Sequence, residues 1–320
     1  MFDNENTVEF AEAFDRPPLD VKAEKKQTAK LGLILLLMMV VMMGVQYLLD
    51  FLLSLRFPHS ENDVFYMWLL VLIPQYCVAY PLTLWLFGKL PKQEISQNEL
   101  TGRSLLKLFA VCYCLLIFGS LIGAGVNSIL ETVFGIDTTL EMDALFYDSP
   151  RLLILAVVVI IGPIFEELIF RKHLLDRLVK YGELPAAVAS ALLFALYHGN
   201  FSQFFYAFFV GLIFAYIYVK TGNIKYSIVL HMAVNFCGSL LPLLIDDSGL
   251  LILLAVYMVL ELSLVVFGGV LLVKNRRRLN FLPSAYAVDN SQAVKIIWLN
   301  WGMIAVVICL CGLFAVDLIF

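Results

Sequence analysis

Long apolar runs separated by short polar segments dominate this chain. Nine of the runs predict helices that cross a bilayer, since about 20 apolar residues span roughly 30 Å of hydrocarbon. They lie near residues 31–55, 64–87, 105–130, 152–171, 185–199, 203–219, 226–245, 250–273 and 296–319, and the fifth and sixth are short. The pattern therefore predicts an all-α, polytopic transmembrane helix bundle of about nine spans.

The composition agrees with a membrane protein. Of the 320 residues, 61% are hydrophobic and only 15% are charged, whereas a soluble domain of this size needs more charge to cover its surface. About 30 mostly polar residues precede the first apolar run, which is too long for the core of a signal peptide. We expect that run to stay as an anchor, the lipid bilayer to be the main partner, and no nucleic acid to bind.

Basic residues occupy alternate connecting segments. Lys and Arg gather before the first run and after the second, fourth, sixth and eighth runs, while the intervening segments are acidic or nearly uncharged. Because cytoplasmic loops of membrane proteins are enriched in Lys and Arg, the N-terminus is predicted to be cytoplasmic and the C-terminus not. We expect residues 1–30 to be a cytoplasmic tail and residues 31–320 to be one multi-pass domain in the cell membrane.

A carboxylate pair interrupts the fourth apolar run. Ionisable groups at membrane depth are costly and usually functional. Glu167 and Arg171 are four residues apart with the acid first, which is the favourable order for an ion pair on a helix. Glu166 lies about 100° further round the helix, so it is left without that partner.

Two further polar clusters follow, at Phe194 with His198 and at His231 with Asn235. His198 lies 16 residues after the predicted turn at Gly182, and Glu166 lies 16 residues before it. An antiparallel hairpin would therefore place both at one level, roughly 24 Å from the turn. His231 and Asn235 share a helix face and reach a similar depth on a third helix.

A carboxylate, two imidazoles and a carboxamide in one layer suit amide hydrolysis by activated water. Glu166 could act as the general base, with His198 holding the same water, and His231 and Asn235 could donate to the oxyanion. The set predicts an intramembrane endopeptidase acting on a membrane-associated or lipidated peptide or protein. Two alternatives stay open: a non-catalytic immunity or regulatory partner in the membrane, and an ion-coupled transporter.

The motifs E-E-x-x-x-R, F-x-x-x-H and H-x-x-x-N, in this order, resemble those of the CAAX-protease and bacteriocin-processing family (CPBP, also called Abi), which includes the endopeptidases that trim prenylated CAAX proteins. The resemblance covers about 80 residues. It implies an eight-helix-like core with a cytosol-facing cavity, and a catalytic core here at about 152–245.

The resemblance also implies a role for each motif residue. The first Glu and the first His of the motifs, here Glu166 and His198, would activate water. The second His and the Asn, here His231 and Asn235, would form the oxyanion site. The supporting residues would be Glu167, Arg171 and Phe194. Members of the family have been described both as metalloproteases and as metal-free glutamate proteases. No H-E-x-x-H pair occurs here, so we expect no cofactor. Zinc held by Glu166, His198 and His231 stays possible, because two His and one carboxylate form a common catalytic set.

Overall fold

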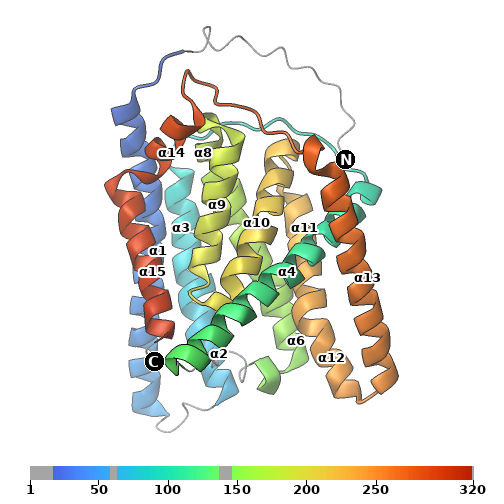
Figure 1. The fold of residues 1–320 in the computed structure, drawn as a ribbon. Coiled ribbons are helices and arrows are strands. Elements are labelled where there is room, and N and C mark those ends of the chain that lie inside the picture. The colour runs from blue at the N-terminus through green and yellow to red at the C-terminus, as the bar shows by residue number, and fades with distance from the viewer. Residues whose placement is uncertain (1–16, 58–62, 137–145, 319–320) are drawn as a thin grey trace.

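The computed structural model describes residues 17–57, 63–136 and 146–318. Within these residues the chain forms helices and no strand, packed as an elongated bundle (Figure 1). Seven helices are long and apolar enough to cross a membrane, or eight if one bent pair counts as a single span. The predicted all-α polytopic bundle is thus confirmed.

The first helix begins earlier than expected. Helix α1 (Val21–Arg56) starts where Asp20 accepts hydrogen bonds from the backbone N–H groups of Lys22 and Ala23, which satisfies donors that have no partner within the helix. Residues 21–30, predicted as tail, are therefore the first turns of α1. The part of the predicted tail at residues 1–16 lies outside the described residues.

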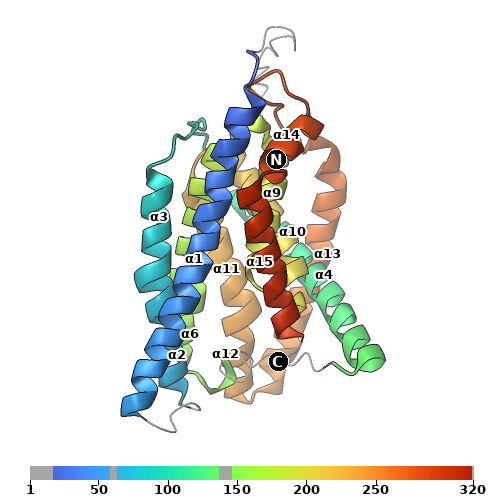
Figure 2. The same cartoon turned by 90° about the vertical axis from the view of Figure 1, so that its left-hand side faces the viewer.

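The second and third spans follow their predicted ranges closely. Helices α2 (Val64–Leu72) and α3 (Tyr80–Gly88) form one span through a π-helical stretch at Ile73–Ala79. Helix α4 (Gly102–Phe134) crosses the bundle diagonally (Figure 1), and its end projects beyond the other helices (Figure 2). A Cβ on its Gly119 would lie 2.4 Å from backbone atoms of Tyr206, so glycine is required for this close helix contact.

The fourth span is a continuous rod from Arg151 to Tyr181. It consists of α6 (Arg151–Ile154), α7 (Gly162–Glu167) and α8 (Asp176–Leu178), joined by π-helical stretches at Leu155–Ile161 and Leu168–Leu175 and closed by a 3₁₀ turn at Val179–Tyr181. The rod ends at Gly182, whose φ is +113°. The turn predicted at Gly182 is confirmed.

Helices α9 (Glu183–Tyr197) and α10 (Phe201–Thr221) form a hairpin. At 15 residues, α9 is about 22 Å long, which is too short to cross. In Figure 1 the α9–α10 turn lies above the lower ends of α2 and α12 (Leu241–Ser248). The fifth predicted span is therefore a helix, but one that ends inside the bundle. Its alanines are fully buried, as at Ala187 and Ala191, which lets its neighbours pack closely.

The last spans cover the remaining sides of the hairpin. Helix α11 (Ile224–Asn235) continues into α12, and α13 (Leu251–Asn275) returns. Helices α14 (Asn290–Trp298) and α15 (Trp301–Asp317) meet at 72°, with α15 running beside α1 (Figure 2). The predicted span at 296–319 is therefore bent where α14 ends and α15 begins, and it counts as one span only if the pair crosses together. It breaks because the Asn300 side chain donates to the carbonyls of Ile296 and Ile297 and accepts from the N–H of Met303.

The two ends of the bundle differ in charge. The start of α1 and the segments around residues 89–101, 176–182, 222–223 and 276–289 meet at one end, which we call the basic end (top of Figure 1). Contacts within it include the Lys180–Glu24 pair at 2.6 Å and the Lys220–Glu183 pair at 2.5 Å. The other end, called the acidic end, carries Asp246 and the Arg151–Asp247 pair at 2.7 Å.

Candidate active site

The two consecutive glutamates of α7 face different surroundings. The Glu167 side chain is fully buried, whereas that of Glu166 is 19% exposed and lines a cavity inside the bundle. Adjacent helical residues point about 100° apart, so the two carboxylates leave the helix in different directions. The predicted pair of Glu167 with Arg171 is confirmed, and Glu166 stands apart from that pair.

The paired acid is Glu167. Its Oε1 lies 3.4 Å from Nη1 of Arg171, and neither side chain is exposed. The Arg171 guanidinium also lies 4.3 Å from the ring centroid of Phe194 and donates to the Gly211 carbonyl at 3.4 Å. A Cβ on Gly211 would meet Arg171 Nη2 and Phe194 Cδ1, each at 3.1 Å. Glycine on α10 thus makes room for this buried cation.

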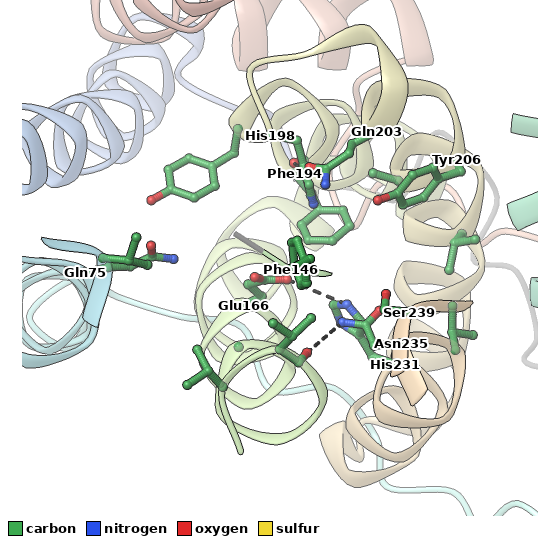
Figure 3. A pocket seen from close by; sticks show the side chains of 18 of the residues that line it. Gln75, Phe146, Glu166, Phe194, His198, Gln203, Tyr206, His231, Asn235 and Ser239 are labelled. Atoms are coloured by element: carbon green, nitrogen blue, oxygen red, sulfur yellow. Dashed lines mark hydrogen bonds and ion pairs between the residues drawn. The ribbon is translucent and has the colours of Figure 1, made fainter. Parts of the chain in front are cut away.

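His231 connects the two glutamates. Its Nδ1 lies 3.0 Å from Glu167 Oε1. Its Nε2 lies 3.6 Å from Glu166 Oε2, and Figure 3 shows this second contact. Because a carboxylate can only accept, Nδ1 carries the proton donated to Glu167. The ring is thereby fixed with Nε2 directed at Glu166. The sequence indicated a depth for His231, but the bridge to Glu167 was missed because it joins two helices 64 residues apart.

His198 directly follows the last residue of α9. Its Nδ1 lies 2.9 Å from the Phe194 carbonyl oxygen, an acceptor, so Nδ1 is the donor. In the neutral ring the lone pair is therefore on Nε2. The Phe194 ring stands edge-on to both imidazoles, with centroids 4.9 Å from His198 and 5.8 Å from His231. Phe194 therefore helps to orient both rings.

Asn235 is the fourth polar group of the layer. One of its amide hydrogens is donated to the Val158 carbonyl at 2.9 Å, which fixes the carboxamide relative to the fourth span. An amide nitrogen carries two hydrogens, so the second is available to a molecule in the cavity. Figure 3 shows Asn235 and His231 side by side, facing the same space as Glu166.

All four predicted catalytic residues line one cavity of about 260 Å³. The wall also contains polar residues that the sequence analysis missed: Gln75, Tyr76, Gln203, Tyr206 and Ser239. A Cβ on Gly162 would lie 3.3 Å from Tyr76 Oη and 3.6 Å from Glu166 Oε1, so Tyr76 is close to the acid. Uncharged polar residues inside apolar runs were the signal that could have identified this second set.

Three of the same groups, Glu166, His198 and His231, form the zinc site that the sequence leaves possible. Among residues 17–57, 63–136 and 146–318, no three His, Cys, Asp or Glu side chains are grouped so that they could hold an ion. His231 has Nδ1 engaged with Glu167 and directs Nε2 at Glu166. Zinc binding by Glu166, His198 and His231 stays a prediction, and chelation would test it.

Comparisons with known proteins found similarity to a protease family model and to a curated membrane protein. A family model described as type II CAAX prenyl endopeptidase Rce1-like matches residues 148–237, which include every site residue predicted above. The curated protein "Putative membrane peptidase YdiL" of Bacillus subtilis (strain 168) is 28% identical over 149 residues, 45% of this chain. The alignment covers 60% of that relative's length. No solved structure matches the chain significantly.

Proposed function

We propose that this chain, whose residues 148–237 match the type II CAAX prenyl endopeptidase Rce1-like family model, is an intramembrane endopeptidase in which Glu166 and His198 activate water. The observation that carries the proposal is the single cavity shared by Glu166, His198, His231 and Asn235. The substrate is a membrane-associated or lipidated polypeptide. A prenylated CAAX tail is the first candidate, because the matching family is described by that activity.

The first chemical step is attack by water. In the proposed mechanism Glu166 removes one proton from a water molecule, while Nε2 of His198 accepts a hydrogen bond from the other. The water oxygen bonds to the carbonyl carbon of the scissile amide, and the carbonyl oxygen takes the negative charge. When the C–N bond breaks, the proton held by Glu166 passes to the leaving nitrogen, which restores the carboxylate and releases an amine and a carboxylic acid.

The oxyanion is stabilised by groups that are already in place. The second amide hydrogen of Asn235 is one donor. His231 is the other when both ring nitrogens are protonated, with Nδ1–H on Glu167 and Nε2–H towards the cavity. The net charge of the cluster is then zero, because Arg171 and protonated His231 balance Glu166 and Glu167. A neutral cluster costs less free energy to bury than a charged one. Donors held rigidly in a water-poor site give a large electrostatic contribution.

The test uses the purified protein in proteoliposomes with two probes, a farnesylated CAAX peptide and a set of quenched fluorescent apolar peptides. Glu166→Gln and His198→Ala are each expected to slow cleavage by about 10²–10⁴-fold, the usual contribution of general acid–base groups. Glu261→Gln is the matched control, because Glu261 accepts from Tyr113 of α4 and from Tyr257 of its own helix α13 and does not line the cavity.

Equal cleavage by the wild type and all three variants would refute the catalytic assignment. If no probe is cleaved while Glu166→Gln complements a deletion strain fully, the non-catalytic regulatory alternative becomes the better account. If the same substitution abolishes a pH-dependent ion flux in the proteoliposomes, the transporter alternative takes its place.

A further inference from the structure

The cavity is closed towards the basic end. Between the catalytic layer and that end, side chains from two helices are fully buried: Phe170, Arg171 and Leu174 from the fourth span, and Phe214, Ile217 and Tyr218 from α10. The Tyr218 hydroxyl donates to Asp176 at 2.6 Å, and Lys172 lies 3.2 Å from the same carboxylate. A peptide could reach Glu166 from the basic end only by displacing this packed layer.

The cavity extends in the opposite direction. Its wall continues through Gln75 and Val71 to Trp68 on α2 and to Phe146, just before α6. Trp68 is the fifth residue of α2, roughly 6 Å from the helix start at the acidic end. Ser239, also in the wall, is separated from that end only by α12. Figure 3 shows Phe146 and Ser239 around the same space as Glu166.

The rim on this side is held by specific contacts. The Trp68 indole N–H donates to the Ser149 hydroxyl at 2.7 Å. Arg151 binds both carboxylate oxygens of Asp247, each at 2.7 Å, and this bidentate arrangement fixes the start of α6 against the end of α12. The same guanidinium also donates to the carbonyls of Tyr147 and Ser149. Hydrogen bonds and an ion pair therefore fix the shape of this rim.

We propose that the substrate enters this cavity from the acidic end, which the distribution of basic loops assigns to the extracytoplasmic side. The substrates are then exported or membrane-inserted polypeptides cut within an apolar stretch, and not the cytoplasmic CAAX tail that the family match suggests first. The carboxamides of Gln75 and Gln203 lie beside the peptide backbone in this arrangement. The direction is opposite to the cytosol-facing cavity that the family resemblance implied. That the entering polypeptide is a substrate rests on the proposed function, whereas the position of the opening does not.

Cysteine accessibility tests this inference without any cleavage assay. Single-cysteine variants are made in the full chain after its six cysteines are replaced by alanine. Ser239→Cys reports the cavity, Asp246→Cys the acidic end and Lys225→Cys the basic end, the last two positions being exposed. A membrane-impermeant maleimide is applied to intact cells and to inverted vesicles. Gln203→Cys repeats the cavity measurement in case Ser239→Cys fails to fold.

The expected result is labelling of Asp246→Cys and of the cavity cysteine in intact cells, and of Lys225→Cys only in inverted vesicles. Labelling of the cavity cysteine only from the Lys225 side, or from neither side in a folded variant, would overturn the opening at the acidic end. An inverted pattern for both end positions would overturn the extracytoplasmic assignment. Adding Glu166→Ala should leave the labelling unchanged, so a failed peptidase assay and a failed access model are distinguishable.

Discussion

Removal of Arg171 is the most direct test of the buried charge cluster. Arg171→Met keeps most of the side-chain volume but leaves Glu167, which is fully buried, without its cation at 3.4 Å. Breaking a buried ion pair by deleting one partner costs about 3–5 kcal/mol, because the remaining charge stays in a poorly polarisable environment. We expect the lower limit of this range of destabilisation, because His231 still donates to Glu167 at 3.0 Å.

A cost of about 3 kcal/mol corresponds to a fall in Tm of about 4–5 °C for a chain of 320 residues, because the entropy of unfolding is about 2.1 cal/mol/K per residue. The double variant Glu167→Gln with Arg171→Met should recover much of that loss. It carries no unpaired charge, and the Gln carbonyl can still accept from His231. Replacement of a whole buried ion pair is often close to neutral, unlike removal of one partner. The two substitutions should therefore be strongly non-additive.

The assay is thermal unfolding in detergent, followed by the loss of the monodisperse peak in size-exclusion chromatography. Lys225→Met is the matched control, since it removes a basic side chain at an exposed position, and such surface substitutions usually change stability by about 0.5 kcal/mol or less. A Tm for Arg171→Met equal to that of the control would refute the buried-pair argument. A double variant no more stable than Arg171→Met alone would refute the charge balance proposed for the cluster.

Three further outcomes are expected. Asn235→Ala should lower kcat by about 10²–10³-fold, the usual effect of losing one oxyanion donor, as measured with the cleaved probe. Gly211→Ala should lower both Tm and activity, because its Cβ would lie 3.1 Å from Arg171 Nη2; Gly44→Ala, whose Cβ would meet nothing within 4 Å, should change neither. Treatment with 1,10-phenanthroline should leave cleavage unchanged, whereas a loss reversed by added zinc would favour the zinc site at Glu166, His198 and His231.

The helices and the depth of the site could be predicted from the sequence because both follow from counting. Equal spacing of Glu166 and His198 about Gly182 depends only on helical rise and on a turn, and both residues line one cavity. The i, i+4 spacing of Glu167 and Arg171 likewise predicts their pairing. These inferences are local to one helix or one hairpin, so they needed no knowledge of how the remaining helices pack.

The contacts between distant helices could not be predicted in the same way. The bond from His231 to Glu167 and that from Asn235 to the Val158 carbonyl depend on the rotation of α11 against the fourth span. That rotation is set partly by two π-helical stretches, which shift the helical phase without a clear mark in the sequence. The break at Asn300 was missed for a related reason, since hydropathy alone does not reveal where a polar side chain caps a new helix.

The short helix α9 explains why a polar site can exist in this bundle at all. A turn inside the membrane exposes backbone groups that lipid cannot satisfy, so it is tolerated only when protein covers it or when it lines a polar cavity. Both conditions hold at the α9–α10 turn: Gly199 is buried, a Cβ there lying 3.2 Å from Leu313 of α15, and His198 lines the cavity. Asn200 caps α10 by accepting from the N–H of Gln203. Because α9 is short, the α9–α10 hairpin ends before it reaches the acidic end. The space beyond its turn is the cavity that Glu166 lines.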